Sequence, residues 1–209
     1  MKLPEHQPKL FIPVNDKDHA QGSPDAPVTL VEYGDYECPY CGKAYPAVRR
    51  IQKKMGDKLR FVFRNFPLNT LHEHASQAAQ AAEAAAAQGK FWHMHDLLYE
   101  NQESLADVDL RHYALKAGLE IYRFEADMSG EAYAKRVRDD FRGGVRSGVN
   151  GTPTFFINGY RFNDVANYRN LLLAVCAAER GEWPAKPAAT AAAAAAAAKV
   201  PVEGKSLLD

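Results

Sequence analysis

VTLVEYGDYECPYC, at residues 28–41, is the stretch that decides the fold of this chain. Its first part, residues 28–33, is rich in β-branched and apolar side chains, and that composition predicts a buried strand. Residues 38–55 are predicted to form a helix, and residues 59–64 repeat the apolar pattern of a strand. A strand, a helix and a strand in this order favour two parallel strands with a right-handed crossover.

Downstream of this unit the sequence predicts a long helical block and then a second group of strands. Alanine, the strongest helix former, dominates residues 72–88. Further helices are expected at residues 91–99, 107–117, 121–128 and 131–146, which together make up a block over residues 70–147. After it we expect a strand at 154–158, a tight Asn158-Gly159 turn, a return strand at 160–162 and a helix at 165–179.

The two ends of the chain differ from this folded middle. Residues 1–24 are polar and contain proline, and we expect an arm with one short extended piece at residues 10–14. Residues 183–209 include an uninterrupted octet of alanine at 191–198. Such a segment cannot bury enough apolar surface to dock firmly, so a flexible Ala-rich tail is expected, and we assign it no function.

Composition limits the function classes. The 209 residues carry 26 Lys and Arg against 26 Asp and Glu, so the net charge is zero and no nucleic-acid partner is expected. No run of about eighteen large apolar residues occurs, so no membrane span is expected. Because residues 1–6 lack the apolar stretch of a secretory signal, the sequence as written predicts a cytoplasmic protein, or a periplasmic one if a leader has been removed. The oligomeric state has no signature.

The residues with the clearest chemistry are Cys38-Pro39-Tyr40-Cys41, which follow a predicted strand and open a predicted helix. At a helix N-terminus the unpaired N–H groups and the macrodipole favour a thiolate at Cys38. Pro39 suits the first helical position. Cys41 lies one turn further on, where it can resolve a mixed disulfide that forms on Cys38.

Half of a zinc site and a purely structural pair of thiols are the other uses of two cysteines at this spacing. The third cysteine, Cys176, is distant in sequence and is expected to be a small core residue. Two histidine pairs, His72 with His74 and His93 with His95, have a spacing that points their rings to different helix faces. We therefore expect no metal, and dithiol redox chemistry is the favoured interpretation.

With these motifs in place, the chain resembles the thioredoxin-fold disulfide oxidoreductases of the DsbA type over about residues 10–180. The motifs that carry the resemblance are the strand leading to CPYC, the segment GTPTFFING at residues 151–159, and QGKFW with Met94-His95-Asp96 between them. A CPYC pair also occurs in glutaredoxins, but those are much shorter and lack a helical insertion.

The resemblance implies an α/β protein with the thioredoxin fold, in which a central mixed sheet is flanked by helices. Residues 25–69 and 148–182 would form the thioredoxin-like domain. The block at residues 70–147 matches, in place and size, the all-helical subdomain that the family inserts into this fold.

The resemblance also implies roles for individual residues. The Thr152-Pro153 bond becomes a candidate cis peptide in a loop that faces the cysteines and presents the Thr152 backbone to a substrate. Tyr40, together with Pro39, is expected to border the bound substrate. Glu32, on the same strand face as Leu30, would be a buried acid behind the resolving thiol that handles the proton of Cys41.

The implied function is thiol–disulfide oxidoreduction on protein or small-molecule disulfides, with Cys38 as nucleophile and Cys41 as resolving thiol. The expected partners are thiol- or disulfide-containing proteins, with glutathione as a further candidate, and no cofactor is needed. CPYC has no positive charge beside Cys38, so an intermediate redox potential is expected. The alternative is a non-catalytic thioredoxin-fold module that binds peptides or acts as a chaperone.

Overall fold

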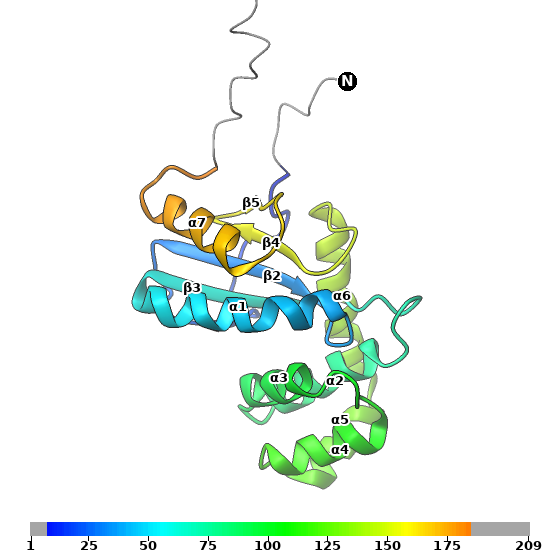
Figure 1. Cartoon of the computed structure of the whole chain (residues 1–209). Helices are drawn as coiled ribbons and strands as arrows, with labels where there is room; N and C mark the ends of the chain where they lie inside the picture. Colours follow the sequence, from blue (N-terminus) through cyan, green and yellow to red (C-terminus); the bar gives the residue numbers. More distant parts are fainter. Residues whose placement is uncertain (1–7, 185–209) are drawn as a thin grey trace, which may run out of the picture.

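A five-stranded mixed sheet forms the centre of the protein in the computed structural model, which describes residues 8–184, apart from the side chains of 131 and 132 (Figure 1). The strands lie in the order β1-β3-β2-β4-β5. Their bounds are β1 His19–Gln21, β2 Val28–Gly34, β3 Leu59–Asn65, β4 Thr154–Ile157 and β5 Tyr160–Arg161.

The parallel pair predicted from the sequence is confirmed. Strands β2 and β3 run parallel, and α1 (Pro39–Met55) with the short 3-10 helix η1 (Gly56–Lys58) connects them. Strand β4 pairs antiparallel with β2, and β5 returns antiparallel to β4. At the turn between these last strands Asn158 and Gly159 both have positive φ, 47° and 82°, as a two-residue hairpin turn requires.

Helices cover both faces of the sheet (Figure 1). Helices α1 and α7 (Tyr168–Glu179) contact each other and one face, while α6 (Glu131–Arg146) contacts the sheet from the other side. A separate group of helices comprises α2 (Ala75–Ala86), α3 (Phe91–Glu100), α4 (Asp107–Lys116) and α5 (Ile121–Ser129). All of α2 to α6 fall within the predicted helical block, so the expected thioredoxin fold with a helical insertion is confirmed.

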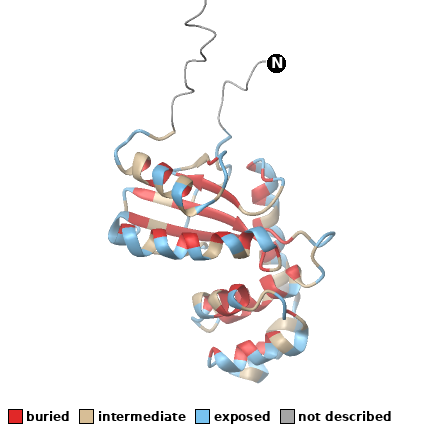
Figure 2. Cartoon of the chain, viewed as in Figure 1, coloured by how far each residue is buried: buried red, intermediate tan, exposed pale blue. Residues whose placement is uncertain are grey.

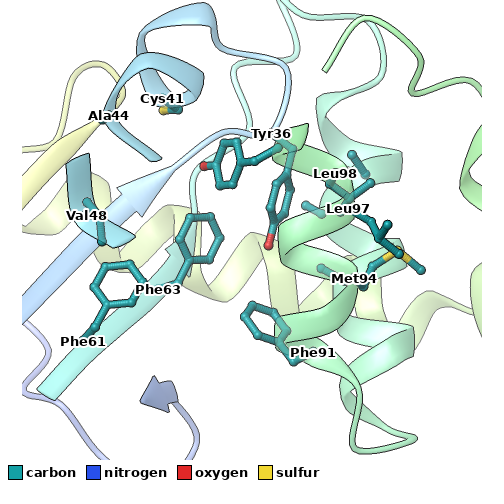
Figure 3. Close-up of a cluster of buried hydrophobic side chains, with 14 of the residues drawn as sticks. Tyr36, Cys41, Ala44, Val48, Phe61, Phe63, Phe91, Met94, Leu97 and Leu98 are labelled. Carbon is teal, nitrogen blue, oxygen red and sulfur yellow. The ribbon is translucent and has the colours of Figure 1, made fainter. Parts of the chain in front are cut away.

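Alternating residues of β2 feed two cores. Leu30 packs with the inner face of α1, whereas Val31 and Tyr33 point to the face that α6 covers. The larger core continues from α1 into α3, because Phe63 lies between the two helices (Figure 3). The buried residues gather where sheet and helices meet (Figure 2). This continuity fixes the helical insertion against the underside of the cysteine motif.

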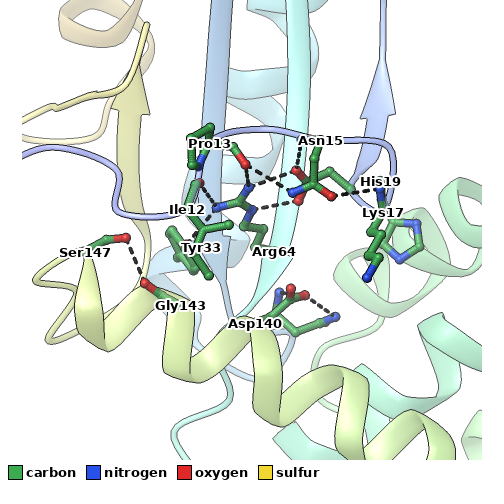
Figure 4. Close-up of polar contacts among 12 residues, drawn as sticks. Ile12, Pro13, Asn15, Lys17, His19, Tyr33, Arg64, Asp140, Gly143 and Ser147 are labelled. Atoms are coloured by element: carbon green, nitrogen blue, oxygen red, sulfur yellow. Dashed lines mark hydrogen bonds and ion pairs between the residues drawn. The ribbon is translucent and has the colours of Figure 1, made fainter.

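The N-terminal segment, predicted to be an arm, forms part of the sheet and packs on the fold. Strand β1 pairs with β3 as an edge strand, and Leu10 donates its N–H to the carbonyl of Gly159. Arg64, 3% exposed, forms a two-bond ion pair of 2.7 and 2.8 Å with Asp18 (Figure 4). A buried guanidinium needs such a partner, and the partner comes from this segment.

The larger differences from the predicted boundaries lie at two helix starts and at the beginning of the tail. Helix α2 begins at Ala75 rather than residue 72, and α7 begins at Tyr168 rather than residue 165 because the Asn167 side chain caps it by accepting from the N–H of Asn170. Trp183, predicted to belong to the tail, donates its indole N–H to the carbonyl of Ile157 at 2.9 Å. The alanine octet lies outside the described residues. Within residues 8–184, no helix combines the length and the apolar character needed to cross a bilayer.

Candidate active site

The cysteine motif lies at the junction of β2 and α1. Cys38 has extended backbone angles and occupies the N-cap position of α1, and Pro39 follows at the start of the helix. The carbonyl of Cys38 accepts the first helical hydrogen bond, from Gly42 at 3.1 Å. The unpaired N–H groups at this end of α1 therefore point toward the Cys38 sulfur.

The environment of Cys38 favours its thiolate. Its hydrogen bond with the Cys41 thiol is the largest influence and lowers the pKa of Cys38 from 9.0 to about 5. The Thr152 side chain and the backbone N–H groups of Tyr40 and Cys41 act in the same direction, while burial opposes them. The Cys38 residue is 3% exposed, so little of its surface is accessible to solvent.

The environment of Cys41 favours its thiol. The residue is completely buried on the inner face of α1 (Figure 3). Burial raises the pKa of Cys41 well above its usual range, and the hydrogen bond to Cys38 and the charge of Glu32 add to the increase. The two cysteines are therefore inequivalent, with a ready nucleophile at Cys38 and a protonated partner at Cys41.

This difference predicts the order in which the thiols react. In the reduced protein Cys38 is expected to react with iodoacetamide at a rate that rises with pH around a midpoint near pH 5, since the thiolate is the reactive form. At pH 6 it should be alkylated about tenfold faster than Cys176, because low thiolate nucleophilicity offsets part of its larger ionised fraction. Peptide mapping by mass spectrometry measures both rates. Faster labelling of Cys176 would contradict the assignment.

The loop before β4 approaches Cys38 from the opposite side. The Thr152–Pro153 peptide bond is cis, and the Cys38 Sγ lies 3.4 Å from the carbonyl oxygen of Thr152. The Thr152 hydroxyl oxygen is buried and lies outside hydrogen-bond geometry with any partner. It is nevertheless close enough to Cys38 to help lower the pKa of that thiol. A small shift would let it donate to the thiolate.

Glu32 lies beneath the cysteines, as the alternation along β2 predicted. It is 2% exposed, and its Oε1 atom has no hydrogen-bond partner. Burial, with a smaller effect of the Cys38 charge, raises the pKa of Glu32 from 4.5 to about 8. Its charge in turn acts on Cys41, so the carboxyl and the resolving thiol compete for protons in one buried environment.

Two side chains that brace the motif carry no sequence signal. Asp35 is buried and accepts hydrogen bonds from the N–H groups of Glu37 and Leu68, and from His72 Nδ1 at 2.7 Å. Gln102, in the loop after α3, donates to the carbonyls of Tyr36 at 2.7 Å and Cys38 at 3.0 Å. Apart from the bond between Glu37 and Asp35, these contacts span 33 to 66 residues of sequence, so only the folded chain reveals them.

Gly42 has a specific role beside this brace. A Cβ atom at this position would collide with the amide of Gln102. Glycine therefore allows Gln102 to reach the carbonyls at the start of α1.

A groove of about 610 Å³ borders the motif between α1 and the segment before α7. Thr152 and Pro153 line it, as does Tyr40, which is 68% exposed. Two cations lie on its aromatic side chains: Lys43 is 5.6 Å from the ring centroid of Tyr40, and Arg50 is 4.0 Å from that of Tyr168. Pro39 is exposed but does not line this groove.

No group of three or more His, Cys, Asp or Glu side chains in the described part of the chain is arranged to hold a metal ion. Cys176 lies on α7, half-buried against the main core rather than near the motif. One histidine of each pair is engaged elsewhere, His72 with Asp35 and His95 with the Tyr36 hydroxyl at 3.1 Å.

Comparison with known proteins agrees with this arrangement. A family model described as thioredoxin matches residues 14–175. A Na(+)/H(+) antiporter NhaA 1 of Salinispora arenicola is 46% identical over 173 residues, covering 82% of this chain and 26% of the relative. The chain thus spans about a quarter of the length of the curated relatives it matches.

Solved structures give the same result. A thioredoxin-like oxidoreductase from Silicibacter pomeroyi has a TM-score of 0.71 at 28% identity, with 79% of this chain and 94% of that one covered. The alpha-DsbA1 protein of Wolbachia pipientis has a TM-score of 0.71 at 19% identity, with 82% and 95% covered. From the family match over residues 14–175 and these folds, this chain belongs to the thioredoxin family and has the fold of its DsbA-type members.

Proposed function

We propose that the protein is a thiol–disulfide oxidoreductase in which Cys38 exchanges disulfides with a substrate and Cys41 resolves the intermediate. The opposite pKa shifts of two adjacent cysteines at the N-terminus of α1 are the observation that carries this proposal. A structural pair of thiols has no need for one acidic and one protonated member, whereas exchange requires both.

The exchange balances as follows in the oxidising direction. A substrate thiolate attacks Cys38 Sγ of the Cys38–Cys41 disulfide, and Cys41 leaves and takes up a proton from Glu32. A second substrate thiolate then attacks the substrate sulfur of the mixed disulfide, and Cys38 leaves as a thiolate. Two electrons pass from the substrate to the protein, and the substrate gains one disulfide. Reduction of a substrate follows the same steps in reverse.

The acidity of Cys38 supports the oxidising direction. Stabilising the Cys38 thiolate stabilises the dithiol form, and so makes the corresponding disulfide a stronger oxidant. A pKa of about 5 falls between the values of about 3.5 and about 7 that mark strongly oxidising and reducing Cys-X-X-Cys pairs. We therefore infer a potential between those extremes, which suits action as an oxidant in an oxidising compartment such as the periplasm.

The protein substrate would bind in extended form across the motif. The backbone of Thr152 lies beside Cys38. Because proline has no backbone N–H, Pro153 cannot compete with Thr152 for hydrogen bonds to a substrate. Pairing of a substrate strand with Thr152 would bring a substrate sulfur to Cys38. Tyr40, exposed at the edge of the groove, would contact apolar side chains of the substrate. Pro39, which is exposed beside the groove, would border the bound substrate on its solvent side.

An insulin reduction assay with dithiothreitol separates this function from a non-catalytic peptide-binding module. The wild-type protein should speed the precipitation of insulin chains, and Cys38→Ser should return the rate to that of dithiothreitol alone. Cys176→Ser is the matched control, because it removes a thiol from α7 and should retain the wild-type rate. Equal rates for wild type and Cys38→Ser would show that the chain binds without catalysing exchange.

A further inference from the structure

A small cavity behind the cysteine motif joins Glu32 to the protein surface. It lies between α1, α3 and the sheet, and its volume of about 10 Å³ is close to the minimum for one water molecule. Glu32, His95 and Asp96 line it, with Tyr45 and Arg49 from α1.

Two oxygen atoms at this cavity are buried without hydrogen-bond partners. They are Oε1 of Glu32 and Oδ1 of Asp96. Buried polar atoms in proteins nearly always have a partner, and a polar cavity with two unpartnered acceptors suits a bridging water. Both unpartnered oxygens, one from β2 and one from α3, border the same cavity, and this points to a connection between the two carboxyl groups.

Asp96 spans the interior and the surface. While its Oδ1 is buried, its Oδ2 accepts a hydrogen bond of 2.8 Å from Arg49 Nη1, and the side chain is 25% exposed. Arg49 itself is 50% exposed. One carboxylate therefore reaches from the cavity to solvent, and Arg49 holds it in that orientation.

We propose that Asp96 is the outlet for the proton that Glu32 takes from Cys41, with one water molecule in the cavity joining the two carboxyl groups. The inference rests on the proposed exchange function. When the mixed disulfide on Cys38 is resolved, the Cys41 thiol gives its proton to Glu32 in its carboxylate form, which is the minor form below pH 8 because burial raises the pKa of Glu32 to about 8. The Cys41 thiolate attacks Cys38 Sγ, and the substrate leaves as a thiolate. The proton then passes through the water to Asp96 and out to solvent, which returns Glu32 to its carboxylate form.

The other groups around Glu32 do not offer a comparable route. The titratable and charged side chains that surround it are Cys38, Cys41, Tyr45 and Arg49 from α1, Tyr36 from the loop after β2, and His95, Asp96 and Tyr99 from α3. Burial lowers the pKa of His95 to about 3, and it raises the pKa of Tyr36 and of Tyr99. These three side chains therefore stay neutral, as does Tyr45, whose pKa is raised by burial and by the nearby Asp96. Asp96 is the carboxyl group in the set of side chains around Glu32.

The test mixes the reduced protein with oxidised glutathione, quenches the reaction in acid, and follows by mass spectrometry how fast the Cys38–glutathione mixed disulfide that forms is resolved and releases glutathione. Asp96→Asn should slow release about tenfold between pH 5 and 8, which is less than the roughly 100-fold or more of a group that transfers the proton directly, because Asp96 acts through Glu32 and a water molecule. Glu103→Gln is the matched control, since it removes one exposed charge from the loop after the same helix and does not line the cavity. Its rate should match the wild type.

A double-variant comparison separates a proton route from a structural effect. If Asp96 acts through Glu32, Asp96→Asn should have little further effect in a Glu32→Gln background. Equal rates for Asp96→Asn and Glu103→Gln at every pH would overturn the inference, and so would an equal slowing with and without Glu32. Failure of the proposed function has a different signature, since the wild type would then release glutathione no faster than Cys41→Ser.

Discussion

Replacing Cys41 with Ser is expected to leave the protein attached to its substrate through Cys38 as a long-lived mixed disulfide. Cys41 lies one turn from Cys38 and already shares a hydrogen bond with it, so in the wild type the resolving attack is intramolecular. Groups held in such proximity react with effective concentrations of about 10⁵ M or more. Without the second sulfur, release has to await an external thiol, whose millimolar concentration is about 10⁸-fold below that effective concentration. Because burial holds Cys41 as the less reactive thiol and offsets part of this advantage, we expect release to slow at least about 1,000-fold.

Non-reducing electrophoresis and intact-mass measurement of Cys41→Ser after exposure to a disulfide-containing protein would show this complex directly. Dithiothreitol should dissolve it, because the link is a disulfide. Cys38→Ser should form no complex, and Cys176→Ser should form only a transient one, as the wild type does. A stable complex through Cys176 would mean that the half-buried cysteine on α7 is the exchanging residue.

Much of this site could be predicted because its chemistry is local in sequence. Cys38, Pro39 and Cys41 lie within one helical turn, so the strand before them and the helix after them suffice to place a cysteine at an N-terminus. Burial of Glu32 follows from a period of two along β2, and the turn at Asn158 from its dipeptide. These signals act over a few residues and survive without tertiary information.

The features that could not be predicted from the sequence depend on contacts between segments that are distant along the chain. Strand β1 has only three residues and forms because β3 offers an edge and because Arg64 needs Asp18, 46 residues away. Gln102 is an unremarkable loop residue until the fold brings it to the carbonyl of Cys38. Asp96 belongs to a motif that resembled the family, but its unpartnered oxygen exists only where α3 packs on α1. Pairings of this kind cannot be read from local periodicity.

The helical insertion consequently has a role in the chemistry as well as in the fold. Helix α3 supplies His95 and Asp96 to the cavity behind Glu32, and the loop after it supplies Gln102 to the cysteine motif. The same helix packs Leu98 and Met94 into the main core, which fixes its position (Figure 3). A change in the packing of α3 would therefore alter both the proton environment of Cys41 and the geometry of Cys38.

Glu32→Gln is expected to make the reduced protein more stable at alkaline pH while it slows the step that needs the proton of Cys41. The pKa of Glu32 rises from 4.5 to about 8 on folding, so below pH 4.5 the group is protonated in both states and costs nothing. As the pH rises toward 8, ionisation of Glu32 stabilises the unfolded chain, whereas Glu32 in the folded chain stays protonated. At about 1.4 kcal/mol per pH unit, the free energy of unfolding falls by an amount on the order of 5 kcal/mol over this range.

Gln cannot ionise, so the difference in unfolding free energy between Glu32→Gln and the wild type should grow in favour of the variant from pH 4.5 to pH 8 and then level off. Urea unfolding of both reduced proteins at pH 4, 6 and 8 measures this difference. The Cys38 thiolate adds its own pH dependence to the stability of both proteins, so that dependence is removed when the two are subtracted. Glu100→Gln, at an exposed position, should differ from the wild type by a constant amount. A constant difference for Glu32→Gln as well would mean that Glu32 ionises as easily in the folded protein as in the unfolded chain. It could not then hold the proton of Cys41 near neutral pH.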